Sequence, residues 1–304
     1  MKRMRRLLVL PLLAASLAAA APQRAGTIDL EVVALDGRAQ PVTDLEPREL
    51  EVWINDFRIP IETVSFVSPQ TGGRGTTIVL VLDDMSVHPA SVPRIREAAR
   101  ALVERLQPGD RIAIVSLNGD SMEATADKAA LVKAIDRHHA RSLPIRFDHA
   151  AQHVFRTVTA LSRQIAEAPG GRKAIVLIGS GWLFDRPVPP PTASIDLRPD
   201  WVDAMRATAN AHASVYVIDP AGVGTAPVTG GSSGFARETG GFAFTNTNDL
   251  GGAAERILSE LRTYYVLTVE DPAVGKKADL REVQVKVQRR GVTVRARRGI
   301  PAPR

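Results

Sequence analysis

The spacing of the hydrophobic residues changes several times along this chain, and one hydrophobic run is unbroken. Residues 78–82 read Ile-Val-Leu-Val-Leu, with no polar member. A short, continuous, β-branched run is typical of a strand buried on both faces. Comparable runs occur at 111–117, 174–178 and 214–219. We therefore expect several neighbouring buried strands.

The segments between these runs have apolar residues three and four positions apart, which predicts amphipathic helices. Strands that alternate with helices favour a parallel sheet. For residues 74–262 we expect an α/β domain, a doubly wound and mostly parallel sheet with helices on both faces. The helices are expected near 91–106, 127–137, 147–165, 200–212 and 249–262.

In the segments before and after this domain, apolar and polar residues alternate with a period of two, the spacing of half-buried strands. Residues 26–70 show it, with Asn55-Asp56 as a hairpin turn. Residues 263–299 show it again, with a turn at 289–291 that predicts a β-hairpin. We expect this C-terminal hairpin to pack with the N-terminal strands as one small β unit.

The first 20 residues have the pattern of a secretory signal peptide. Four basic residues precede an apolar run at 7–17, and Ala18-Ala19-Ala20 offers a cleavage site. An uncleaved anchor is the alternative, although the run is short for a membrane span. The pattern predicts an exported protein, periplasmic or secreted, with no stable membrane span after cleavage.

Composition narrows the possible chemistry. The chain has no cysteine, which excludes disulfides, thiol nucleophiles and thiolate metal sites. It has 39 basic and 33 acidic residues, and four basic residues leave with the signal, so the net charge falls from +6 to +2. A nearly balanced charge gives no indication of nucleic-acid binding.

The candidate site follows the run at 78–82. Asp83 and Asp84 come directly after it, Ser86 is close, and a helix begins a few residues later. Ligand sites of open α/β sheets lie at the carboxyl ends of strands, beside helix N-termini. Such oxygen donors suit Mg²⁺ or Ca²⁺. We expect the two carboxylates to face an open cleft.

Several motifs resemble a family of exported bacterial proteins with a von Willebrand factor A (VWFA)-related domain. Asp84-x-Ser86-x-His88 resembles the Asp-x-Ser-x-Ser signature of that family, and residues 238–250 and 264–267 follow its later motifs. The resemblance implies a metal-ion-dependent adhesion site, with Asp83, Asp84 and Ser86 as the candidate ligands. It also implies a protein partner, whose carboxylate completes the shell of the cation.

The sequence departs from the family at three positions. His88 replaces the second serine, no threonine is found near Pro144, and no carboxylate is found at 179–181. Two hypotheses follow for Asp83, Asp84 and Ser86. They hold a cation with reduced affinity, or they form a degenerate, metal-free crevice in which the carboxylates accept hydrogen bonds from backbone amides.

Catalytic motifs are incomplete. His149 and His153 have zinc-protease spacing, but Ala150 stands where that motif requires Glu. Ser180 has Ile178 and Trp182 at the positions where the Gly-x-Ser-x-Gly nucleophile elbow requires glycines. We therefore expect a non-enzymatic protein-binding module. The alternative is a cation-independent structural scaffold in a periplasmic or cell-surface assembly.

Overall fold

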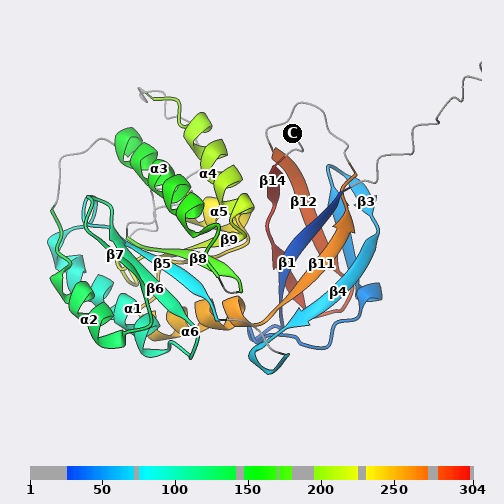
Figure 1. Cartoon of the computed structure of the whole chain (residues 1–304), viewed down its shortest axis with the longest axis horizontal. Coiled ribbons are helices and arrows are strands. Elements are labelled where there is room, and N and C mark those ends of the chain that lie inside the picture. The colour runs from blue at the N-terminus through cyan, green and yellow to red at the C-terminus, as the bar shows by residue number, and fades with distance from the viewer. Residues whose placement is uncertain are drawn as a thin grey trace, which may run out of the picture.

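The computed structural model describes residues 26–71, 75–141, 147–169, 171–179, 195–224, 231–272 and 280–301. The predicted signal peptide lies outside them. Figure 1 shows two units side by side, a helix-covered sheet on the left and a β unit on the right.

The first unit is built on a six-stranded sheet with the order β10-β9-β8-β5-β6-β7. All neighbouring pairs are parallel except β6 and β7, which are antiparallel. Leu80 of the central strand pairs with Ile114 on one side and Val176 on the other. The strands are β5 (Thr77–Leu82), β6 (Arg111–Ser116), β7 (Ser121–Thr125), β8 (Lys173–Ile178), β9 (Ala213–Ile218) and β10 (Ala243–Phe244).

Strand β5 is buried along its whole length. Ile78, Leu80 and Leu82 pack with α1 (Val92–Glu104), α2 (Lys128–Arg137) and α6 (Leu250–Arg262). Val79 and Val81 face the opposite core, with α3 (Phe147–Ile165), α4 (Arg198–Asn210) and α5 (Gly231–Glu238). No helix in the described ranges is long and apolar enough to cross a membrane.

The second unit is a sandwich of two antiparallel sheets, β13-β1-β11-β4 and β14-β12-β2-β3. Leu30, Val52, Leu267 and Val283 lie in the core between them. The strands are β1 (Thr27–Leu35), β2 (Leu50–Ile54), β3 (Phe57–Ile59), β4 (Ile61–Val67), β11 (Tyr264–Glu270), β12 (Leu280–Val287), β13 (Thr293–Ala296) and β14 (Gly299–Pro301). Short 3₁₀ turns are η1 (Pro47–Glu49), η2 (Pro69–Thr71) and η3 (Pro89–Ser91).

The predicted fold class, a doubly wound and mostly parallel sheet with only a small β unit, is wrong. In the described part of the chain, eight strands belong to two wholly antiparallel sheets, and the remaining sheet is mixed. Strand β7 was missed because Ser-Met-Glu-Ala-Thr has no apolar run, which an antiparallel edge strand does not need. Helix α5 was missed because its sequence is rich in glycine and serine.

The C-terminal segments also pair differently from the prediction. The turn predicted at Asn55-Asp56 is confirmed, because β2 pairs with β3 and both turn residues have positive φ. Strands β12 and β13 do not form the predicted hairpin with each other. Strand β12 pairs with β2 and β14 in one sheet, and β13 pairs with β1 in the other. Alternation along a strand marks its buried face and says nothing about its neighbour.

A fully buried arginine joins the two units. Arg172, just before β8, lies 3.0 Å from the Glu31 carboxylate of β1. It also donates hydrogen bonds to the Ser214 hydroxyl at 2.9 Å and to the Glu260 carbonyl at 3.1 Å. The Glu260 carboxylate in turn pairs with Arg295 of β13. Paired charges therefore cross the junction between the sandwich and the six-stranded sheet.

We expect Leu80→Ala to lower the free energy of unfolding by about 2–5 kcal/mol, since it opens a cavity beside a fully buried strand. Urea denaturation followed by circular dichroism measures the change. Val223→Ala, at a side chain that is 61% exposed, is the control and should change stability by less than about 0.5 kcal/mol. Equal effects of the two substitutions would contradict the central position of β5.

Candidate functional site

The sequence-predicted site lies where β5 ends. The Asp83 amide donates to the Ile178 carbonyl of β8 at 3.0 Å, and the Leu117 amide, after β6, donates to the Leu82 carbonyl at 3.2 Å. These bonds hold the chain between the carboxyl ends of its two parallel neighbours. Asp83 and Asp84 are only 0% and 1% exposed, so the expectation that they face an open cleft is wrong.

The Asp83 carboxylate is engaged by its own turn. One oxygen accepts hydrogen bonds from the amides of Met85, at 3.0 Å, and Ser86, at 2.9 Å. The other accepts a hydrogen bond from the Ser86 hydroxyl. Asp83 and Ser86 therefore form a local turn. His88 is exposed, and its ring accepts from the Ala90 amide at the start of η3.

The Asp84 carboxylate has a cationic partner from the same chain. One oxygen accepts from the Asn118 amide at 3.1 Å, and the other lies 3.3 Å from Nε of Arg141. The Arg141 amide donates to the Asp84 carbonyl at 2.7 Å, and its guanidinium donates to Asp120 at 3.0 Å. Burial raises the pKa of Asp84, against the opposing effects of the Asn118 hydrogen bond and the Arg141 charge.

Gly179, directly after β8, has no room for a side chain. A Cβ atom at this position would lie 2.4 Å from Cβ of Asp83 and 2.7 Å from one of its carboxylate oxygens. The VWFA resemblance implies an aspartate at the end of this strand. The close packing of the backbone against Asp83 excludes one.

The residues present do not fit a divalent cation. Asp83, Asp84 and Ser86 lie together, but their oxygens are engaged by amides, a hydroxyl and a guanidinium. Within the described ranges, no group of three or more His, Cys, Asp or Glu residues could hold a metal. A cation would have to displace Arg141 and the turn hydrogen bonds, and it would lack the distal donors that Mg²⁺ and Ca²⁺ need.

A buried histidine was missed by the sequence analysis. His138 is 5% exposed, and Arg96 donates to its carbonyl at 3.1 and 2.6 Å. Burial, together with the charge of Arg96, lowers the pKa of His138 to about 4, against the opposing charge of Asp83. His138-His139 has no distinguishing pattern, because only the tertiary packing separates a buried imidazole from its exposed neighbour.

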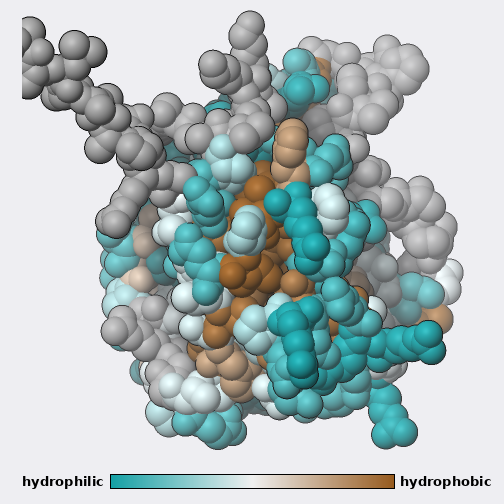
Figure 2. Space-filling model, turned by 90° about the vertical axis from the view of Figure 1, so that its right-hand side faces the viewer, coloured by the Kyte–Doolittle hydropathy of each residue, from teal (hydrophilic) through white to brown (hydrophobic). Residues whose placement is uncertain are grey.

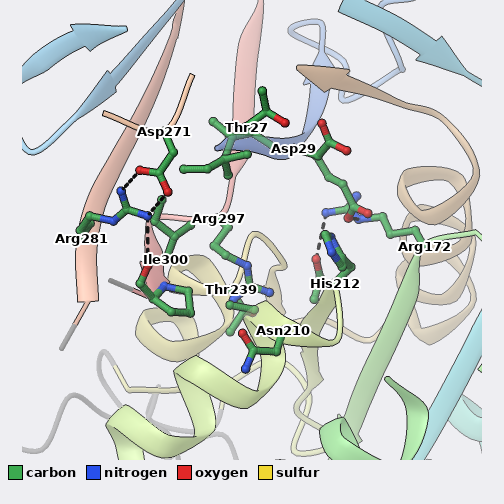
Figure 3. Close-up of a pocket in the computed structure, with 16 residues that line it drawn as sticks. Thr27, Asp29, Arg172, Asn210, His212, Thr239, Asp271, Arg281, Arg297 and Ile300 are labelled. Atoms are coloured by element: carbon green, nitrogen blue, oxygen red, sulfur yellow. Dashed lines mark hydrogen bonds and ion pairs between the residues drawn. The ribbon is translucent and has the colours of Figure 1, made fainter. Parts of the chain in front are cut away.

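A cavity of about 540 Å³ lies elsewhere, between β1 and the residues that precede β8 and β9 (Figure 3). It is at the amino edge of the six-stranded sheet, whereas Asp83 and Asp84 are at the carboxyl edge. Its lining comes from distant segments, among them Glu31, Arg172, His212 and Arg297. No local motif marks such a set, so the cavity could not be predicted from the sequence.

Comparison with known proteins does not assign the chain to a family. No protein-family model matches it, and no curated protein matches it. Among solved structures, it is similar to the D319A mutant of the PilB minor pilin from Streptococcus sanguinis, with 11% identity, 63% of this chain and 62% of that chain covered, and a TM-score of 0.44. The PilB minor pilin itself matches with 12% identity, 66% and 63% coverage, and a TM-score of 0.40.

The human COPII-coat protein Sec24c is also similar, with 9% identity, 76% of this chain and 44% of that chain covered, and a TM-score of 0.36. The chain spans less than two thirds of the length of each of these three structures. Likenesses this distant carry no argument about what the chain does.

Acidification is expected to destabilise the protein through His138. Its pKa is about 6.5 unfolded and about 4 folded, so the unfolded state binds more protons between these values. Stability is present above pH 6.5 and is lost as the pH falls toward 4, by about 3 kcal/mol from this group. Asp84, with a raised pKa, acts in the opposite direction.

Urea denaturation at several pH values, in wild type and His138→Gln, isolates the histidine. The variant should lose much of the acid destabilisation. His139→Gln, at the exposed neighbour, should keep the wild-type profile. If His138→Gln and wild type have the same pH dependence, the buried imidazole is not responsible.

Titration with Mg²⁺ or Ca²⁺ should give no binding heat and no change in melting temperature, because Arg141 and the turn already satisfy the carboxylates. Isothermal calorimetry and thermal denaturation measure both. Heat in wild type that disappears in Asp84→Asn would show that a cation does bind there.

Proposed function

We propose that this chain is an exported, non-enzymatic protein-interaction module, distantly related to VWFA-type proteins, that binds its partner without a divalent cation. The N-terminal signal pattern supports export, and the motifs quoted from the sequence support the relationship. The engaged state of Asp83 and Asp84 supports cation independence. The partner surface is the open side of the β-sandwich.

The observation that carries this proposal is an apolar band on that side. Figure 2 shows it, with hydrophilic side chains along both flanks. Strands β3 and β4 are the edges of their two sheets and are adjacent along the chain, so both sheets end on the same side. Phe57 of β3 is 57% exposed. Ile61, Val64 and Phe66 of β4 are only partly buried against the sandwich core.

An extended segment of a partner protein fits this side. Strand β4 is seven residues long, and Glu62 is its only charged residue. Edge strands that avoid pairing are usually short, charged, bulged away or covered. Strand β4 has one bulge, at Glu62, and is regular from Thr63 to Val67, which is the part available for pairing. A partner strand added along β4 would gain backbone hydrogen bonds from the edge and apolar contacts from the band.

The carboxyl edge of the six-stranded sheet is the second candidate surface, as the VWFA resemblance implies. Asp120 has a side chain that is 76% exposed, and Arg141 one that is 34% exposed. These two residues offer a polar rim above the buried Asp84.

Capture experiments with the full chain separate these surfaces. Ser65→Lys, at an exposed position of β4, should abolish capture of an extracytoplasmic partner, because a charged side chain blocks strand addition. Gln284→Lys, exposed on β12, is the matched control and should not affect it. A chelator should have no effect.

Two results would contradict the proposal. Capture lost in the presence of a chelator would mean that a cation is required. Capture that persists in Ser65→Lys but is lost in Asn118→Trp, at an exposed residue of the carboxyl edge, would move the binding surface to that edge.

A further inference from the structure

Several charged side chains line the cavity between the two units. They come from segments far apart in the sequence, so no motif indicates them. Two of its three arginines are paired with carboxylates of the same lining. Arg172 lies 3.0 Å from Glu31, and Arg281 lies 2.5 Å from Asp271. The remaining lining carboxylate, Asp29, accepts a hydrogen bond from the Thr268 hydroxyl at 2.8 Å.

Arg297 has a different set of partners. Its guanidinium donates to the Thr208 hydroxyl and the Thr208 carbonyl, both at 3.1 Å, and to the Ala213 carbonyl. Within the described ranges, it makes no ion pair with a carboxylate. The Thr208 carbonyl belongs to the last turn of α4, where the helix dipole favours a cation but offers only part of a charge.

The environment of Arg297 is unfavourable for an unneutralised charge. Burial lowers its pKa to about 10, opposed by the charge of Glu31 and reinforced by that of Arg172. Arg297 is partly buried, and desolvating a charge without an ionic partner is unfavourable. Three of its five N–H donors are used by the bonds above, which leaves two for a ligand.

The other lining groups suit a small polar molecule. Figure 3 shows the Arg297 side chain directed toward Asn210 and Thr239, in the middle of the lining residues. His212 and Asn210 are exposed at the α4–β9 turn. The volume of about 540 Å³ lies within the range of small-molecule pockets, about 300–1,000 Å³.

We propose that this cavity binds the oxyanion group of a small molecule, a carboxylate or a phosphate, through the Arg297 guanidinium. The two remaining donors, Nε–H and one Nη1–H, point in different directions, so each offers a single charge-assisted hydrogen bond to such a group. The side chains of Asn210 and His212 would complete the contact. Because the lining comes from both units, the ligand stabilises their junction. This site is independent of the partner surface proposed on the sandwich.

Inorganic phosphate is the first probe and succinate the second, each titrated into the full chain at constant ionic strength. About 10 mM of the preferred anion should raise the melting temperature by about 2 °C or more. Calorimetry should give a saturable binding heat. A response to phosphate alone, to succinate alone or to both identifies the preferred oxyanion.

Two variants test the location of the site. Arg297→Gln should remove the response, while Arg290→Gln, the same change at an exposed arginine outside the lining, should keep it. Arg297→Gln could also disturb the α4–β9 turn, because Arg297 donates hydrogen bonds to Thr208 and Ala213. Asn210→Glu leaves those hydrogen bonds in place and is the second test. It places a repelling carboxylate in the cavity and should also remove the response.

Gln284→Glu, at an exposed residue of β12, is the charge-matched control for Asn210→Glu. No response of the wild-type chain to either anion overturns the proposal. An equal response in wild type and Asn210→Glu also overturns it, because the anion then binds elsewhere.

Discussion

The structure depends on burying β5 on both faces. Its alternate residues supply two separate cores, Ile78, Leu80 and Leu82 to one and Val79 and Val81 to the other. A strand without a polar side must have sheet neighbours on both edges and helices on both faces. Burial also affects the residues that directly follow such a strand. They lie between the ends of the two neighbouring strands and are shielded from water together with them.

Asp83 and Asp84 are in that position, and their chemistry follows from it. A carboxylate buried to this degree is stable only when its lone pairs are satisfied and its charge is balanced. The chain meets this requirement internally, through the turn to Ser86 for Asp83 and through Arg141 for Asp84. The same residue types that would bind a cation at an open edge therefore stabilise a loop here, and Gly179 closes the remaining space.

The junction of the two units uses charge in a different way. Glu31 and Glu260 neutralise Arg172 and Arg295, so these pairs fix the sandwich against the six-stranded sheet. Arg297 crosses the same junction with carbonyl and hydroxyl partners, beside a cavity. The junction and the two proposed binding surfaces therefore lie away from the carboxyl edge, at the amino edge and on the open side of the sandwich.

Local sequence patterns were enough to predict several elements: the buried strand at 78–82, the turn at Asn55-Asp56, the periodicity of α1 and the adjacency of Asp83, Asp84 and Ser86. Periodicity reports which face of an element is buried, because that depends on residues a few positions apart. The pairing of β12 with β2, the antiparallel arrangement of both sandwich sheets and the contact of Arg141 with Asp84 are visible only in the folded chain. These choices depend on the summed contacts of segments tens to hundreds of residues apart, and no local pattern records them.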